Sequence, residues 1–211
     1  MRETFFSPWK AAPLILFLSF LFMPFSSSPL GAQQLDVLLD EIEQLIADKD
    51  FTTALEDLKF LAQQIQDLRL REAAAFFPEA PEGWMADEAL RTSREEEPWS
   101  RRLEARRRYL PAKGTGKVEI AFDFHSSLLP AVTMSLNPVY IAGDRFSESF
   151  EQAGWPGRIH FNSDTGEGEI LLIVDRRILV TVLGRGIAGR AVLQEFISLV
   201  DLRTLSSFNL P

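Results

Sequence analysis

The hydrophobic positions of residues 34–75 follow the period of an α-helix, in two runs separated by a short polar turn. In the first run, residues 34–48, the apolar positions are Leu35, Leu38, Leu39, Ile42, Leu45 and Ile46. In the second, from about Thr52 to Ala75, the inward positions are Ala54, Leu55, Leu58, Leu61, Ile65 and Leu68. Asp50 is a natural N-cap for the second run. Residues 33–77 therefore predict an antiparallel helical hairpin, packed on its own domain or on a second chain.

The helical pattern ends in a segment rich in proline and glycine. After the second run, the six residues from Pro78 to Gly83 contain two prolines and a glycine, and a helix cannot continue through them. The acidic, weakly patterned stretch that follows shows neither helical nor strand periodicity. We therefore expect residues 78–100 to form a linker.

From residue 101 the period changes to two, as in β-strands. Strands are expected from Arg101 to Leu110, from Lys117 to Phe124, from Arg158 to Asn162, from Glu169 to Val174 and from Ile178 to Leu183. Helices are expected over residues 126–136, stopped by Asn137-Pro138, and over residues 188–205. Short turns between strands favour antiparallel pairing. Residues 101–211 thus predict an α+β sandwich, an antiparallel sheet covered by helices on one face.

The first 32 residues have the three parts of a signal peptide. Arg2 and Lys10 give a positive start, residues 11–25 form an apolar run, and small residues lead to Ala32. The competing interpretation is an uncleaved membrane anchor. The apolar run is shorter than the roughly 20 residues that a spanning helix needs, and it contains Pro24. We expect cleavage after Ala32, a periplasmic location, and no membrane-spanning segment after cleavage.

Composition narrows the possible functions. The formal charge of −8 makes nucleic acid an unsuitable partner, because its phosphates are bound mainly by neutralisation. The chain has no cysteine, which excludes disulfides, thiol catalysis, cysteine-ligated metals and a lipoprotein anchor at a cleavage-site cysteine. An exported chain without cysteine must be held together by its core alone.

Several junctions carry a resemblance to known proteins. The helical hairpin, the segment from Phe77 to Trp84, the Asn137-Pro138 pair and the stretch from Arg177 to Gly186 resemble a family of exported proteobacterial proteins of unknown function. These motifs are structural, so the resemblance carries over no catalytic residue. The order of strands and helices is also similar to the PsbP/Mog1-like sandwiches, which implies an accessory or binding role.

Two patterns suggest chemistry but lack the context for it. Residues 184–189 match G-x-G-x-x-G, yet only 22 residues follow Gly189, too few for a nucleotide-binding fold. Asp123, His125 and Ser126 could form a triad on paper. However, neighbours along a strand point to opposite faces, and no Gly-x-Ser-x-Gly elbow exists. His125 and His160 do not supply a metal site. We expect no catalytic residue, no cofactor and no metal.

The most informative polar feature is a basic cluster, and three loop tryptophans accompany it. The cluster comprises Arg101, Arg102, Arg106, Arg107, Arg108, Lys113 and Lys117, and the tryptophans are Trp84, Trp99 and Trp155. The cluster is either a solvated outer sheet face, which could pair with the acidic helices, or a docking patch for an anionic partner. The tryptophans either mark an interface or pack over the sheet edge.

These patterns favour an exported, non-enzymatic accessory protein that binds another envelope protein through the hairpin or the sheet face. A module for a small ligand, an anionic lipid or a glycan is the alternative, suggested by the aromatic strands and the basic cluster. A hydrolase whose site is assembled from distant residues, such as His125 and His160, is the third.

Overall fold

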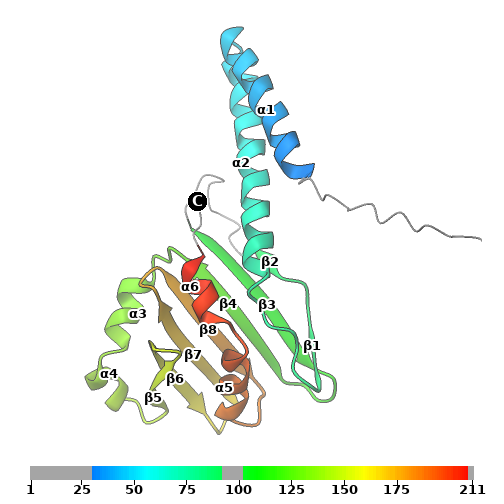
Figure 1. The fold of residues 1–211 in the computed structure, drawn as a ribbon. Helices are drawn as coiled ribbons and strands as arrows, with labels where there is room; N and C mark the ends of the chain where they lie inside the picture. The colour runs from blue at the N-terminus through cyan, green and yellow to red at the C-terminus, as the bar shows by residue number, and fades with distance from the viewer. Residues whose placement is uncertain (1–29, 92–101, 209–211) are drawn as a thin grey trace, which may run out of the picture.

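The computed structural model describes residues 30–91 and 102–208, and Figure 1 shows a two-helix arm standing on a domain built around one sheet. The helices are α1 (Leu30–Ala47), α2 (Phe51–Ala74), α3 (Leu129–Ser135), α4 (Pro138–Ala142), α5 (Arg190–Ser198) and α6 (Leu202–Ser207). The strands are β1 (Trp84–Ala86), β2 (Leu90–Arg91), β3 (Leu103–Pro111), β4 (Lys117–Phe124), β5 (Ser147–Gln152), β6 (Trp155–Asn162), β7 (Glu167–Val174) and β8 (Ile178–Arg185). Of the predicted leader, only residues 30–32 are described, at the start of α1. Across the described ranges, no helix has the length and apolar character to span a membrane.

All strand pairings of the sheet are antiparallel, which confirms the α+β class. The strand order is β1-β3-β4-β8-β7-β6-β5, and β2 also pairs with β3. Pairing of β4 with β8 joins the β3–β4 hairpin to the meander that runs from β5 to β8. The meander has four strands where three were expected. The polar sequence of β5 carries no alternation that would reveal it, because this edge strand is largely exposed.

The main core lies between one sheet face and the two C-terminal helices. Alternate residues of the central strands, such as Ile120, Leu172 and Val180, have no exposed surface. Phe196 of α5 packs onto them and meets the ring of Tyr109 at a centroid distance of 4.9 Å. Burial of each such side chain contributes about 1.5–3 kcal/mol to the free energy of folding. The sheet domain is therefore stabilised by a continuous apolar layer.

Helices were expected on only one face of the sheet, whereas the structure has helices on both faces. α5 and α6 lie on the core face, whereas α3 packs on the opposite face (Figure 1). There Val132 of α3 contacts a small cluster with Ile173 and Leu179. Strands β7 and β8 are apolar on both faces at this end, so the second face also needs a cover.

Three segments differ in secondary structure from what the sequence indicated. The expected linker contains β1 and β2, which pair with β3, and the Tyr109 hydroxyl donates to the Pro78 carbonyl at 2.9 Å. Asn137 does not only end a helix, because its side chain also caps α4 by accepting from the Val139 amide at 2.9 Å. The expected C-terminal helix is two helices, since Asp201 caps α6 through Thr204.

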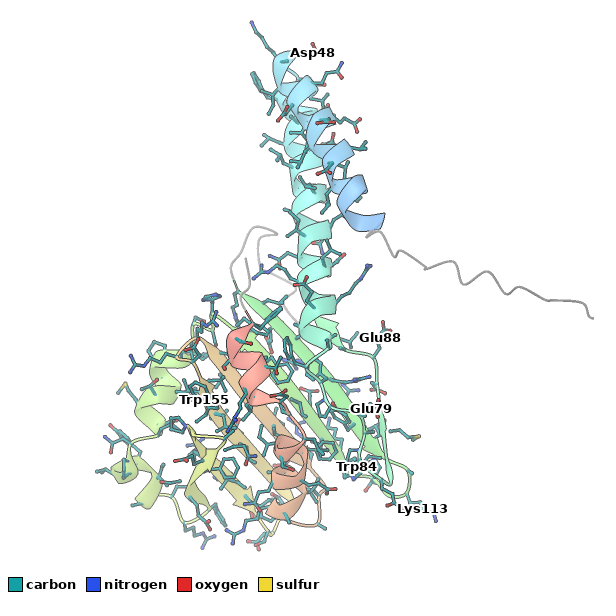
Figure 2. The ribbon with its side chains drawn as sticks, in the orientation of Figure 1. Asp48, Glu79, Trp84, Glu88, Lys113 and Trp155 are labelled. Atoms are coloured by element: carbon teal, nitrogen blue, oxygen red, sulfur yellow. The ribbon has the colours of Figure 1, made fainter. Side chains whose placement is uncertain are left out.

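The arm consists of α1 and the N-terminal part of α2, which lie side by side and project beyond the sheet domain (Figure 1). Asp48 lies at its free tip (Figure 2). The predicted N-cap is confirmed, because Asp50 accepts from the backbone amide of Thr53 at 3.2 Å and from its hydroxyl at 2.8 Å. These hydrogen bonds lower the pKa of Asp50. At the other end of α2, Ala73 belongs to the core, and the ring of Phe77 just beyond the helix stacks on Phe122 at 4.4 Å.

Candidate functional site

The arm exposes large apolar side chains that no part of the described chain covers. Six of them form what we call the open arm face: Leu39, Ile46, Phe51, Leu55, Leu58 and Ile65. Their exposed fractions range from 40% for Leu58 to 66% for Leu55. Leu55, Leu58 and Ile65 were expected to point inward, and that expectation is wrong. α1 covers only one stripe of α2, at Ala54 and Leu61, because a single neighbouring helix buries a narrow seam.

The six residues lie on one side of the arm. On α1, Leu39 and Ile46 are displaced by about 60° and 40° around the axis from the buried Ile42. On α2, Leu58 and Leu55 are displaced by about 40° and 100° in the same rotational sense from the buried Ala54. When side chains on two antiparallel helices are displaced from the shared seam in the same rotational sense, they lie on the same side of the helix pair. The open arm face is therefore one continuous surface.

The spacing along α2 is that of a helix with a second helical neighbour. Phe51, Leu55, Leu58, Ala62 and Ile65 follow one another at intervals of four and three, the period of a coiled-coil seam. This stripe adjoins the one that α1 covers, so α2 has an apolar seam for each of two neighbours. In the described part of the chain, α1 is the only helix that lies against this part of α2.

Two boundaries define the open arm face. At its base, the same side of α2 is buried, at Gln66, Arg69 and Ala73, and Ala73 packs into the main core. The Gln66 side-chain oxygen accepts from Arg69 at 3.1 Å, and burial lowers the pKa of Arg69. Along α1, its edge is a row of exposed carboxylates that we call the acidic edge: Asp36, Asp40 and Glu43. The surface is thus apolar along its centre and anionic along one side.

Three members of the predicted basic cluster, Arg102, Arg106 and Arg108, lie beside carboxylates of the same sheet. Arg102 makes two hydrogen bonds of 3.0 Å to Asp123, and Arg106 pairs with Glu104 at 2.6 Å and Glu119 at 3.1 Å. Arg108 lies 3.9 Å from Glu119. Cross-strand register between β3 and β4 brings these charges together. The partners are sheet residues, whereas the sequence suggested the acidic helices.

The remaining members of the cluster separate. Arg107 is on the other face of β3 and donates to the Asp87 carbonyl at 2.8 Å. Lys113 lies in the β3–β4 turn (Figure 2), and Lys117 stands opposite Arg185 in the register of β4 and β8. No acidic side chain of the described residues is within ion-pair distance of Lys117 or Arg185. Arg101 lies outside the described residues.

The two described tryptophans pack on the domain. The ring of Trp84 meets Phe196 edge-on at a centroid distance of 5.0 Å. Trp155 starts β6 and packs against the main core (Figure 2), with its indole nitrogen buried. Both contacts fit the packing interpretation of these residues. Trp99 lies outside the described residues.

The histidines and their neighbours are engaged in structural contacts. Of the triad candidates around His125, Asp123 pairs with Arg102, and the Ser126 hydroxyl accepts from the Leu128 amide at 3.2 Å. His160 Nδ1 lies 2.9 Å from Asp144 and 3.1 Å from the Ser147 hydroxyl.

Asp144 organises the turn before β5. It accepts from the Ser147 hydroxyl and the Phe146 amide, and these bonds, with a smaller contribution from His160, lower its pKa to about 2. A relay of the serine protease kind needs the carboxylate and the hydroxyl on different ring nitrogens. Here both contact Nδ1, which is an arrangement that fixes a turn.

The glycine motif serves packing between β8 and α5. A Cβ on Gly184 would lie 2.5 Å from the end of the Ile187 side chain and 2.8 Å from the end of the Leu193 side chain, so a larger residue would require both side chains to shift. Gly186 has φ of +62°, a conformation that favours glycine. β8 lies between two antiparallel neighbours, whereas dinucleotide folds place this motif after a parallel strand.

Comparison with known proteins gives no family for the chain: no family model, no curated protein and no solved structure matches it. The resemblance to exported proteobacterial proteins therefore stays a prediction.

Proposed function

We propose that this chain is an exported, non-enzymatic accessory protein of the periplasm, and that it binds another envelope protein through the open arm face. The observation that carries the proposal is the unpartnered apolar stripe of α2, from Phe51 to Ile65. The periplasmic location rests on the sequence of the leader.

The cost of an exposed apolar surface supports the proposal. Contiguous apolar patches on soluble proteins mark sites of interaction or risk aggregation. The six side chains expose on the order of 500 Å², because each is about half exposed and a free Leu, Ile or Phe presents close to 200 Å². With a partner of equal size, this reaches the roughly 1,000 Å² of a specific interface.

Purification of the tagged full-length chain from its own host tests the proposal. The variant Leu55→Gln/Leu58→Gln removes two members of the open arm face. Phe60→Gln is the matched control, because Phe60 is 53% exposed but lies about 200° around the helix from Leu58. We expect a protein that the wild type and the control retain and the double variant loses. The same set of proteins from all three chains would contradict the proposal.

A second candidate function, recognition of an anionic headgroup, is favoured by the Lys117–Arg185 pair. Like charges directly opposite on neighbouring strands destabilise a sheet unless something neutralises them. Both side chains line a groove of about 210 Å³ on the sheet face that α5 and α6 leave open. Co-sedimentation with vesicles of anionic phospholipid tests this candidate. We expect Lys117→Gln/Arg185→Gln to abolish binding and Arg176→Gln, a distant exposed cation, to preserve it; equal binding by both variants would contradict it.

A further inference from the structure

We infer that the occupant of the open arm face is an amphipathic helix of a partner protein with one basic edge, docked as the third helix of a bundle. This inference rests on the proposed function and specifies its partner. Two observations lead to it: the arrangement of apolar seams on the arm and the row of carboxylates beside them.

The apolar pattern is that of a three-helix bundle with one helix missing. α2 has one seam buried against α1 and a second, exposed seam beside it. α1 likewise adds Leu39 and Ile46 to its buried seam, which widens its apolar face beyond what one neighbour covers. The two exposed stripes face the same side, so a single helix lying along the arm would contact both.

The length of the surface limits the occupant. The seam from Phe51 to Ile65 spans about 21 Å at 1.5 Å per residue, the length of a four-turn helix. Below Ile65 this side of α2 is buried, beginning at Gln66. A helix of about 15 residues fits between the tip of the arm and the domain.

The acidic edge determines the charge of the occupant. Asp36, Asp40 and Glu43 are spaced by four and three, so they form one line beside Leu39 and Ile46. Like charges at this spacing destabilise a helix. No cation of the described residues lies within ion-pair distance of the three. Lysine or arginine along the adjoining edge of a partner helix would offset this repulsion.

Two other occupants fit the surface less well. The sheet domain lies on the same side of α2 as the open arm face, so a second copy would bring a second domain and a second acidic α1 against the first. An anionic membrane surface attracts basic segments, and the acidic edge would be repelled by it.

Binding of synthetic peptides to the purified chain lacking residues 1–32 tests the inference by fluorescence anisotropy. Both peptides are 15-residue amphipathic helices with leucine at the seam positions. One carries lysine along one edge and the other carries glutamate there. We expect the lysine peptide to bind at least tenfold more tightly, with the ratio shrinking in 0.5 M salt because the charges are screened.

The variants localise the binding. Leu55→Gln/Leu58→Gln should weaken the lysine peptide at least tenfold, and Phe60→Gln should leave its affinity unchanged. Asp36→Asn/Asp40→Asn/Glu43→Gln should remove the discrimination between the peptides without altering an apolar residue, and it tests the charge independently if the first variant disturbs the arm.

Equal affinity for both peptides, no binding of either, or binding that the leucine substitutions leave unchanged would overturn the inference. Self-association of the chain that the leucine substitutions abolish would also overturn it, in favour of a second copy. A host protein that depends on Leu55 and Leu58 but presents a strand or an acidic helix would overturn the inference and leave the proposed function standing. If no such protein exists, the proposed function fails as well.

Discussion

The arm and the sheet domain handle hydrophobic side chains in opposite ways. In the domain, the apolar residues of the central strands face α5 and α6, and Phe122, Phe196 and Leu193 have no exposed surface. In the arm, Leu55 and Phe51 are more than half exposed, although they belong to a regular seam. The two regions share the helix α2, so the difference lies in what covers each part of that helix: Ala73 near its C-terminal end belongs to the main core, whereas no described residue covers the open arm face.

The largest expected effect is a difference in how much truncation of an apolar side chain destabilises the protein in the two regions. Phe196→Ala removes the aromatic side chain at the centre of the main core and should lower the free energy of unfolding by about 3–5 kcal/mol. Leu55→Ala, a large-to-small change on the open arm face, should change it by about 0.5 kcal/mol or less. Urea unfolding followed by tryptophan fluorescence measures both. A loss of several kcal/mol for Leu55→Ala would show that the arm face is part of the folded core.

A smaller effect tests the contact that ties the segment after α2 to the sheet. Tyr109→Phe removes the hydrogen bond to the Pro78 carbonyl and should cost about 1 kcal/mol at neutral pH. Burial raises the pKa of Tyr109 to about 12, so the unfolded chain, with an ordinary tyrosine pKa near 10, loses its proton first. Wild-type stability should therefore fall from pH 10 to 12.

Urea midpoints across this range measure the effect. Tyr109→Phe should show a shallower decline than the wild type. The other tyrosine of the chain, Tyr140, is exposed, and Tyr140→Phe is the control. Identical alkaline declines for Tyr109→Phe and Tyr140→Phe would contradict the buried hydrogen bond.

The N-cap of α2 allows the stability of the arm to be tested separately from that of the sheet domain. Asp50→Ala removes the hydrogen bonds to Thr53 and should weaken the start of α2. Hydrogen exchange should then accelerate in the first turns of α2 and stay unchanged in β4 and β8. Asp48→Ala, at the tip and outside the cap, serves as the control. Faster exchange throughout the sheet would mean that the arm and the domain unfold as one unit.

The smallest effect concerns the turn before β5. The pKa of Asp144 is lowered to about 2, mainly by the Ser147 hydroxyl, so its contribution to stability is present above the ordinary value near 4 and is lost as pH falls from 4 to 2. Asp144→Ala should flatten the acid side of the stability profile, whereas Asp164→Ala should not. Thermal unfolding between pH 2 and 7 compares them. Parallel acid profiles for the wild type and Asp144→Ala would refute the assignment.

The sequence predicts what depends on local periodicity. Alternation in residues 117–124 and the apolar run in residues 178–183 indicate strands that the structure confirms, and Asp50 is an N-cap as predicted. It does not predict what depends on distant neighbours. The pairing of Arg102 with Asp123 requires the register of β3 on β4, and β5 is polar because it is an edge strand.

The candidate site shows the same limit. Helical spacing identifies Leu55, Leu58 and Ile65 as apolar positions of α2, but it does not show how many helices pack against them. The signal was present in the width of the stripe, since Phe51, Leu55, Leu58, Ala62 and Ile65 form a seam separate from that of Ala54 and Leu61. Only the placement of α1 shows which of the two seams is free.

Site-specific photocrosslinking in the intact cell envelope tests the central claim most directly. A photoreactive residue at position 58 lies within the open arm face, where Leu58 is 40% exposed, and one at position 60 replaces Phe60, which is 53% exposed about 200° around the same helix. If the open arm face binds a partner protein, position 58 should give a discrete adduct with another envelope protein, and position 60 should give none. Equal adducts from both positions, or none from position 58, would contradict it.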